Sequence, residues 1–210
     1  MTMVFNAHRY SGNLQQALEI NDEILGLIRQ HGLEGQPILM STLSNRAMLL
    51  PLLDRHDEAG DLHRQALELT LARYPADGLR VARQRMFYGM ALVQASQFDD
   101  ALAQLTPALE VMRQKWPDNH VMTQMAVHWM GGALAGLGRY EEALPLHREA
   151  WRQTLADPGS VPARVQSTGS RLVRALGETG HCDEARTLVA EDPQQRSDWL
   201  SQTPCTADTL

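Results

Sequence analysis

Apolar residues recur every three or four positions along most of the chain, which is the spacing of an amphipathic helix. Leu43, Ala47 and Leu50 form one such stripe, and residues 130–137 carry another. Glycines and prolines interrupt these patterns at intervals, as expected for short links between helices. The pattern therefore predicts a succession of helices joined by brief turns.

A signature of a turn residue, an aromatic residue and an alanine recurs at a spacing of 42 residues. The alanines are Ala17, Ala59, Ala101, Ala143 and Ala185. The residues three positions earlier, in the aromatic slot, are Leu14, His56, Phe98, Tyr140 and Cys182, and the turn residues are Gly12, Asp54, Ser96, Gly138 and Gly180. Small residues also recur twelve positions before and seven positions after most of the alanines. Such a period indicates a stack of units with two helices each, packed through small residues where the helices cross.

Prolines that interrupt the helical pattern set the expected boundaries of the units. Pro75 and Pro117 are themselves 42 residues apart, and Pro37 precedes the second unit. We expect an array over residues 1–192, and a polar C-terminal tail over 193–210 that is either irregular or a short capping helix. The units of the array are expected at about 1–35, 36–77, 78–119, 120–161 and 162–192. Pro51 should kink the first helix of the second unit or end it early.

The clearest copy of the signature reads Gly138-Arg139-Tyr140-Glu141-Glu142-Ala143. This Gly-x-Tyr-x-x-Ala pattern, with a further alanine seven residues later, resembles the tetratricopeptide repeat. The 42-residue length and the Pro-Asp link at residues 117–118 resemble the kinesin-light-chain type. The resemblance implies an all-α, right-handed superhelical solenoid of about five helix-turn-helix repeats. HEAT-like repeats share the length range, but they would not explain the recurring signature.

Composition excludes several classes of partner. The net charge of −6 argues against a nucleic-acid-binding surface, which needs clustered Lys and Arg. The sequence has no apolar run long enough to span a membrane and no signal-peptide pattern at its start, so we expect a cytoplasmic protein that does not bind membranes. That compartment favours free thiols at Cys182 and Cys205, with Cys182 in the core and Cys205 in the polar tail; a disulfide between them is the alternative.

The sequence predicts no catalytic residue, no metal site and no cofactor. Residues 54–63 combine carboxylates with His56 and His63, which would suit a metal. The repeat register explains them better, because His56 occupies the aromatic slot and the carboxylates begin a helix. Phosphate-binding, nucleophile-elbow and zinc-protease motifs are missing from the sequence. We therefore expect a protein that is not an enzyme.

The first helix of each unit has a stripe that faces away from its packed side. In the family that the sequence resembles, first helices line the concave face of the solenoid, so this stripe is the predicted groove. We call its selected members the first-helix stripe; they are Asn45, Met48, Arg83, Phe87, Met90, Met125, Trp129, Arg171 and Arg174. Asn45 matches the position at which this family often contacts the backbone of a peptide. Exposed apolar strips usually mark interaction sites, and methionines adapt to varied ligands.

These observations predict a noncatalytic adaptor that holds a peptide or helix of a partner protein, with an apolar anchor and an acidic flank. The first alternative is a regulatory or self-association module of a larger signalling protein, such as a kinase-associated module, because bacterial relatives often accompany such domains. Homo-oligomers would then form through the open ends of the solenoid. The second alternative is that the stripe only packs internally, with Trp199 and Leu200 of the tail filling the groove.

Overall fold

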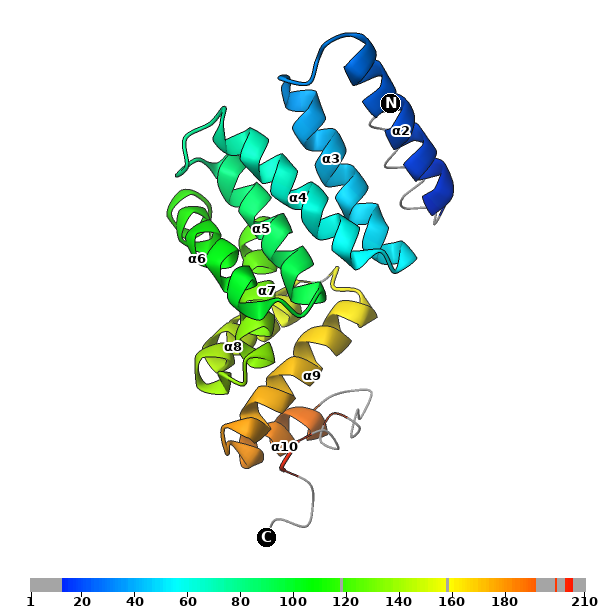
Figure 1. The fold of residues 1–210 in the computed structure, drawn as a ribbon. Coiled ribbons are helices and arrows are strands. Elements are labelled where there is room, and N and C mark those ends of the chain that lie inside the picture. The colour runs from blue at the N-terminus through cyan, green and yellow to red at the C-terminus, as the bar shows by residue number, and fades with distance from the viewer. Residues whose placement is uncertain (1–12, 118, 158, 192–198, 200–202, 206–210) are drawn as a thin grey trace. The chain divides into compact units, whose positions relative to one another are not determined.

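The computed structural model of the chain describes residues 13–117, 119–157, 159–191, 199 and 203–205 (Figure 1). The chain divides into two compact units, unit 1 over residues 1–115 and unit 2 over residues 116–210. Every regular element among the described residues is a helix, which confirms the all-α prediction.

Unit 1 contains a single helix followed by two helix-turn-helix pairs among its described residues. Its elements are α2 (Leu14–Gln30), α3 (Pro37–Leu49), the short 3₁₀ helix η1 (Leu50–Leu53), α4 (His56–Leu71), α5 (Leu79–Gln94) and α6 (Phe98–Lys115). Gly12 lies outside the described residues, as does the predicted first helix of the first repeat.

Unit 2 contains two further pairs. Its helices are α7 (Val121–Gly136), α8 (Tyr140–Ala156), α9 (Pro162–Glu178) and α10 (Cys182–Ala190). The start of α9 follows from its sequence, because Pro162 at the first helical position has a φ angle suited to a helix and no N–H to satisfy.

The turn inside each pair has the same backbone conformation. The predicted turn residues Asp54, Ser96, Gly138 and Gly180 all have positive φ, between 58° and 78°. The next residue's N–H then donates to the carbonyl of a leucine five positions back, a bond that closes the end of a helix. The four N–H to C=O bonds are Arg55 to Leu50, Gln97 to Leu92, Arg139 to Leu134 and His181 to Leu176, at 2.8–3.0 Å. A repeated sequence signature has therefore produced a repeated backbone structure.

The signature alanines are all fully buried. The position twelve residues before a signature alanine leaves no room for a larger side chain in two of the pairs. A methyl group added to Gly89 of α5 would lie 2.5 Å from Leu105 of α6, and one added to Gly131 of α7 would lie 2.9 Å from His147 of α8. The predicted small positions are therefore required by close helix packing.

Pro51 ends α3 early, as predicted. The α-helix stops at Leu49, and residues 50–53 continue as a 3₁₀ helix that begins with the proline near its N-terminus. Pro51 cannot donate the backbone hydrogen bond that a continued α-helix would need. The turn at Asp54 nevertheless keeps the geometry of the other three pairs.

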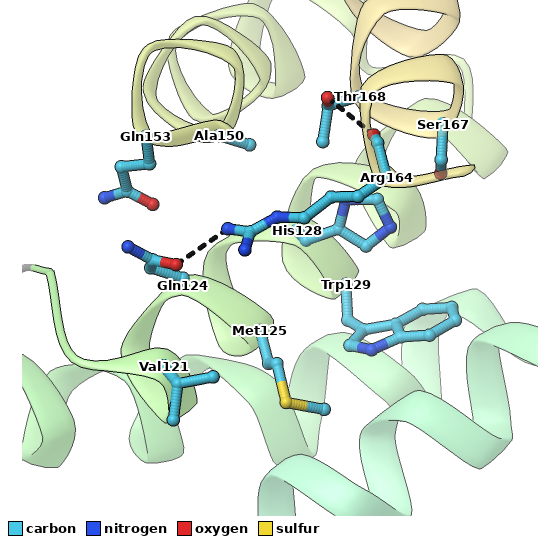
Figure 2. Close-up of a pocket in the computed structure, with 10 residues that line it drawn as sticks. All are labelled: Val121, Gln124, Met125, His128, Trp129, Ala150, Gln153, Arg164, Ser167 and Thr168. Carbon is cyan, nitrogen blue, oxygen red and sulfur yellow. Dashed lines mark hydrogen bonds between the residues drawn. The ribbon is translucent and has the colours of Figure 1, made fainter. Parts of the chain in front are cut away.

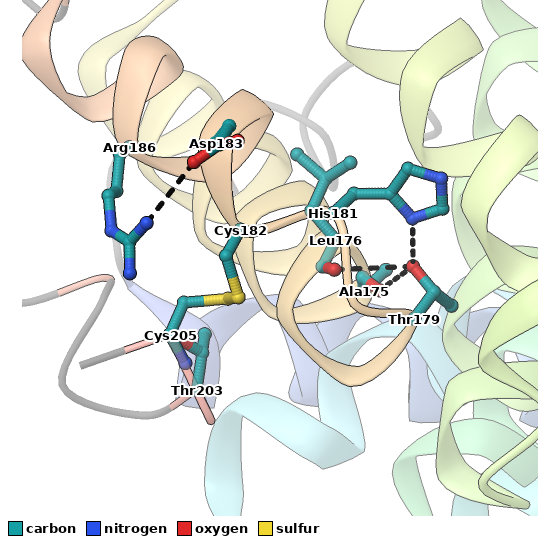
Figure 3. Close-up of a disulfide and its surroundings, with 9 residues drawn as sticks. All are labelled: Ala175, Leu176, Thr179, His181, Cys182, Asp183, Arg186, Thr203 and Cys205. Atoms are coloured by element: carbon teal, nitrogen blue, oxygen red, sulfur yellow. Dashed lines mark hydrogen bonds and ion pairs between the residues drawn. A yellow bond between two sulfur atoms is a disulfide. The ribbon is translucent and has the colours of Figure 1, made fainter. Parts of the chain in front are cut away.

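The prediction of free cysteines was wrong, because Cys182 and Cys205 form a disulfide (Figure 3). Cys205 does not lie in a solvated tail but is buried, with a Cα–Cα distance of 5.2 Å to Cys182. Their separation of 23 residues in sequence gave no sign of this proximity. Disulfides persist mainly in oxidising compartments, so this bond does not fit the cytoplasmic location from which free thiols were predicted.

Two described residues of the predicted tail, Trp199 and Thr203, pack against α9. Trp199 is buried, and its ring lies within 2.2 Å of the place where a Cβ on Gly169 would stand. The same ring meets Trp151 of α8 edge to face, with centroids 6.3 Å apart. One predicted plug, Trp199, is therefore part of the core of unit 2, whereas Leu200 lies outside the described residues.

Candidate functional site

A pocket of about 260 Å³ opens in unit 2 between α7, α8 and α9 (Figure 2). Its lining residues are Val121, Gln124, Met125, His128 and Trp129 from α7, Ala150 and Gln153 from α8, and Arg164, Ser167 and Thr168 from α9. The pocket lies at the beginnings of α7 and α9 and the last turns of α8. Apolar side chains therefore share one space with a guanidinium, an imidazole and two amides.

Local sequence positions the two helices that contribute most of the wall. His120 caps α7, since its Nδ1 accepts a hydrogen bond from the backbone N–H of Met122 at 3.2 Å. In the link before α9, Asp157 accepts the N–H of Gly159 at 3.0 Å. The Asp157 carboxylate also pairs with Arg164 of α9 at 3.3 Å, which ties the link to the first turn of the helix.

Arg164 crosses the pocket from α9 to α7. Its Nη2 donates to Oε1 of Gln124 at 2.7 Å, as Figure 2 shows, while its Nη1 faces Asp157. Its guanidinium is thus held from two sides and has a defined direction. This fixed cation forms the polar side of the pocket.

Arg171 adjoins the pocket across the ring of Trp129. Its guanidinium carbon lies 5.8 Å from the ring centroid, a distance suited to a cation–π contact. Burial lowers the pKa of Arg171. Among the described residues, none forms an ion pair with it.

The two histidines near these arginines are held neutral. Burial, reinforced by the charges of Arg171, His147 and Arg164, lowers the pKa of His128 to about 3. Burial and the charge of Arg171 likewise lower the pKa of His147 to about 4. At neutral pH the pocket therefore combines positively charged arginines with an uncharged His128 imidazole.

The predicted stripe residues of unit 2 fall into two groups. Met125 and Trp129 line the pocket, and Arg171 lies beside it. Arg174 is separate, because its exposed guanidinium lies over the ring of Tyr140, 5.9 Å from the centroid.

The predicted stripe residues of unit 1 are only partly accessible. Arg83 is exposed, whereas Asn45, Met48, Phe87 and Met90 are half-buried. The Phe87 ring stacks on the buried imidazole of His63, with centroids 6.1 Å apart. The half-buried residues of this stripe therefore contribute to packing inside unit 1 as well as to its surface.

Sequence reasoning missed most of the polar wall. Gln124, His128, Arg164 and Thr168 were not among the predicted site residues. A signal for one of them was present, because Arg164 stands seven residues before Arg171 and so shares its face of α9. Extending the stripe toward the beginnings of the helices would have found it.

Solved structures show which fold this is, although the sequence matches no protein-family model and no curated protein. A putative kinesin light chain from Podosopora anserina with nearly identical TPR-like repeats is 16% identical, with a TM-score of 0.73 over 95% of this chain and 93% of its own. BtubC (BKLC) from P. vanneervenii is 19% identical, with a TM-score of 0.75 over 94% and 78%.

A Rap protein, solved in complex with Competence and Sporulation Factor, is 17% identical to this chain. Its TM-score is 0.69, covering 93% of this chain and 52% of the Rap chain. The chain therefore has the fold of tetratricopeptide-like repeat proteins, and its structural neighbours include proteins of the kinesin-light-chain type. The predicted resemblance is confirmed at the level of the fold.

Proposed function

We propose that this chain is a noncatalytic adaptor that binds a segment of a partner protein on its first-helix stripe. The observation that carries the proposal is the pocket of unit 2, whose wall includes the half-buried side chains of Met125 and Trp129. Large apolar side chains left accessible beside a cation are typical of protein-binding surfaces, whose strongest contacts come from Trp, Tyr and Arg.

The comparisons support a binding role for the fold. The Rap protein was solved with Competence and Sporulation Factor bound, and its fold covers nearly all of this chain. Arrays of helix pairs bind partners through extended concave surfaces. Among the described residues no helix is both long and apolar enough to cross a bilayer, and no three or more His, Cys, Asp or Glu side chains are placed to hold a metal.

In unit 2 the proposed anchor is the pair Met125 and Trp129. Trp129 meets His128 edge to face at 5.4 Å and Arg171 on its ring face, so its orientation is fixed before a partner arrives. A preoriented aromatic side chain loses little conformational entropy on binding. Methionine beside it adapts to the shape of the incoming side chain.

A random peptide library displayed on phage and selected on the immobilised protein tests this proposal. We expect the selected peptides to bind Trp129→Ala at least tenfold more weakly than the unaltered protein, with thermal unfolding nearly unchanged. Leu155→Ala is the control, because Leu155 is 64% exposed on α8 and lies outside the pocket. Peptides that bind all three proteins equally, or a library that yields none, would contradict the proposal.

Tyr140→Ala separates packing from binding. Tyr140 packs on the hydrophobic core of unit 2, so its loss should lower the unfolding temperature. Equal losses of helicity in Tyr140→Ala and Trp129→Ala would mean that the proposed anchor is only a packing residue. A mass that rises with protein concentration would instead favour the self-association alternative.

A further inference from the structure

The Cys182–Cys205 disulfide joins two parts of unit 2 that pack together (Figure 3). Cys182 is the first residue of α10, and Cys205 is buried 23 residues later in the sequence. The backbone N–H of Cys205 donates to the Thr203 hydroxyl at 3.2 Å. Thr203 in turn lies on Gly177 of α9, so the disulfide also holds Thr203 against that helix.

Trp199 makes the second contact between this part of the chain and the helices. Its ring fills the space over Gly169 of α9 and meets Trp151 of α8 edge to face. Trp199 is the one described member of the core cluster of unit 2 that lies beyond α10, since the other buried members belong to α8, α9 and α10. Its position therefore decides whether that cluster is covered.

The disulfide restricts how far Trp199 and Thr203 can move from α9. Trp199 lies six residues before Cys205, so the bond keeps it within a short reach of α10. Without the bond, Trp199 and Thr203 are attached to the helices only through the chain that follows Ala190. The released state then gains conformations and the packed state gains none, so breaking the bond favours release.

The bond is open to attack from the side of Cys182. This residue is half-buried whereas Cys205 is 1% exposed, so an incoming thiolate reaches the Cys182 sulfur more easily. The attack forms a mixed disulfide with Cys182 and releases Cys205 as a thiolate, which takes a proton from water. The second thiol of a dithiol reductant then displaces Cys182. The products are two protein thiols and the oxidised, disulfide form of the reductant.

We propose that the Cys182–Cys205 bond is a redox switch that holds or releases the residues packed on α9. With the bond intact, Trp199 and Thr203 stay on the helix. After reduction by a dithiol they leave it, and the face of α9 that carries Gly169 becomes accessible together with the core beneath the indole. This inference concerns regulation and does not depend on the adaptor function.

Alkylation of the reduced protein measures the release. The protein is reduced with dithiothreitol, the reductant is removed without air, and modification of Cys205 by iodoacetamide is followed by peptide mass spectrometry. We expect a rate within about tenfold of the rate in the urea-unfolded chain, because release exposes the thiol. Stronger protection of Cys205 would mean that these residues stay packed without the bond, and it would overturn the inference.

Indole N–H signals in a ¹H–¹⁵N NMR spectrum separate release from general unfolding. Trp199→Phe and Trp129→Phe identify the signals of these two residues of unit 2. Reduction is expected to move the Trp199 signal to the position of an indole in water and to leave the Trp129 signal in place. A Trp199 signal that stays in place would exclude release, and loss of both folded signals would show that unit 2 unfolds instead.

The double variant Cys182→Ser, Cys205→Ser is the matched control, because it has neither the bond nor the thiols. Its Trp199 signal should match that of the reduced chain and should not respond to dithiothreitol. In the unaltered protein, reoxidation by glutathione disulfide should return the Trp199 signal to its first position. A response of the serine variant to dithiothreitol, or a failure of reoxidation to restore the signal, would contradict the proposed switch.

Discussion

Lowering the pH from 7 to 5 is expected to destabilise unit 1 by about 2 kcal/mol through His63, and unit 2 by about 2 kcal/mol through His147 in addition to the share of His128. His63 in unit 1 and His147 in unit 2 are only 1% and 2% exposed, and burial lowers the pKa of each from 6.5 to about 4. The unfolded chain binds protons at these sites as the pH falls below about 6.5, whereas the folded chain does not. The contribution of each neutral histidine to the free energy of unfolding is therefore fully present above pH 6.5. It decreases as the pH falls, until the pH reaches the folded-state pKa of about 4.

The fully developed loss below pH 4 would be about 3 kcal/mol per histidine, which is large beside the roughly 5–15 kcal/mol of an ordinary domain. Among the described residues, neither ring nitrogen of His63 has a hydrogen-bond partner, nor does Nε2 of His147. The buried rings thus have little to compensate a charge. This effect should appear in urea unfolding curves recorded at pH 7, 6 and 5.

The chain itself supplies the control substitution. His63 and His147 occupy the position four residues after the signature alanine, and the same position in the intervening repeat is Leu105, which is buried against Gly89. His63→Leu and His147→Leu should therefore fit, and each should remove its share of the pH dependence. If both variants lose stability between pH 7 and 5 as steeply as the unaltered protein, the buried histidines are not the cause.

Removing the Trp199 side chain is expected to destabilise unit 2 by about 3–5 kcal/mol, as for other buried aromatic residues. The indole fills the notch over Gly169 and contacts Trp151, so its loss leaves a cavity in the core of the unit. The second glycine of α9, Gly177, is likewise covered by Thr203 of the tail. Both glycines are explained by the side chains of Trp199 and Thr203 that pack on them.

A double-mutant cycle tests this contact directly. Gly169→Ala alone should be strongly destabilising, because the new Cβ would stand 2.2 Å from the Trp199 ring. In the Trp199→Ala background the same change should be neutral or stabilising, since alanine favours helix by about 1 kcal/mol over glycine. Thermal unfolding under non-reducing conditions measures all four proteins. Additive effects would show that Trp199 does not pack on Gly169.

Much of the fold could be predicted because the repeat fixes local chemistry. A turn residue that tolerates positive φ and a buried alanine recur at the same positions of successive repeats. Each copy therefore supports the assignment of the others. Asp54 and Ser96 stand at the predicted turn positions and adopt the left-handed conformation, although neither is glycine. The number of repeats and their outer boundaries remain predictions, because residues 1–12 lie outside the described part of the chain.

The site was less predictable, because it depends on contacts between repeats. The link between Arg164 and Gln124 joins residues 40 positions apart, and the Cys182–Cys205 bond joins residues 23 apart. Helical periodicity places a side chain on a face but does not say which neighbour meets it. The predicted stripe includes Met125 and Trp129, which line the pocket, and Arg171, which contacts Trp129. It also includes Arg174, which lies over Tyr140 instead.

The most direct test of the adaptor function is affinity capture from a lysate of the source organism, quantified by mass spectrometry. The intact protein is compared with the double variant Phe87→Ala, Trp129→Ala, which alters one stripe residue in each unit. The control is Leu71→Ala, Leu155→Ala, which alters one exposed second-helix leucine in each unit. We predict a protein that is retained by the intact chain and the control and lost from the stripe variant; identical captures by all three would contradict the account.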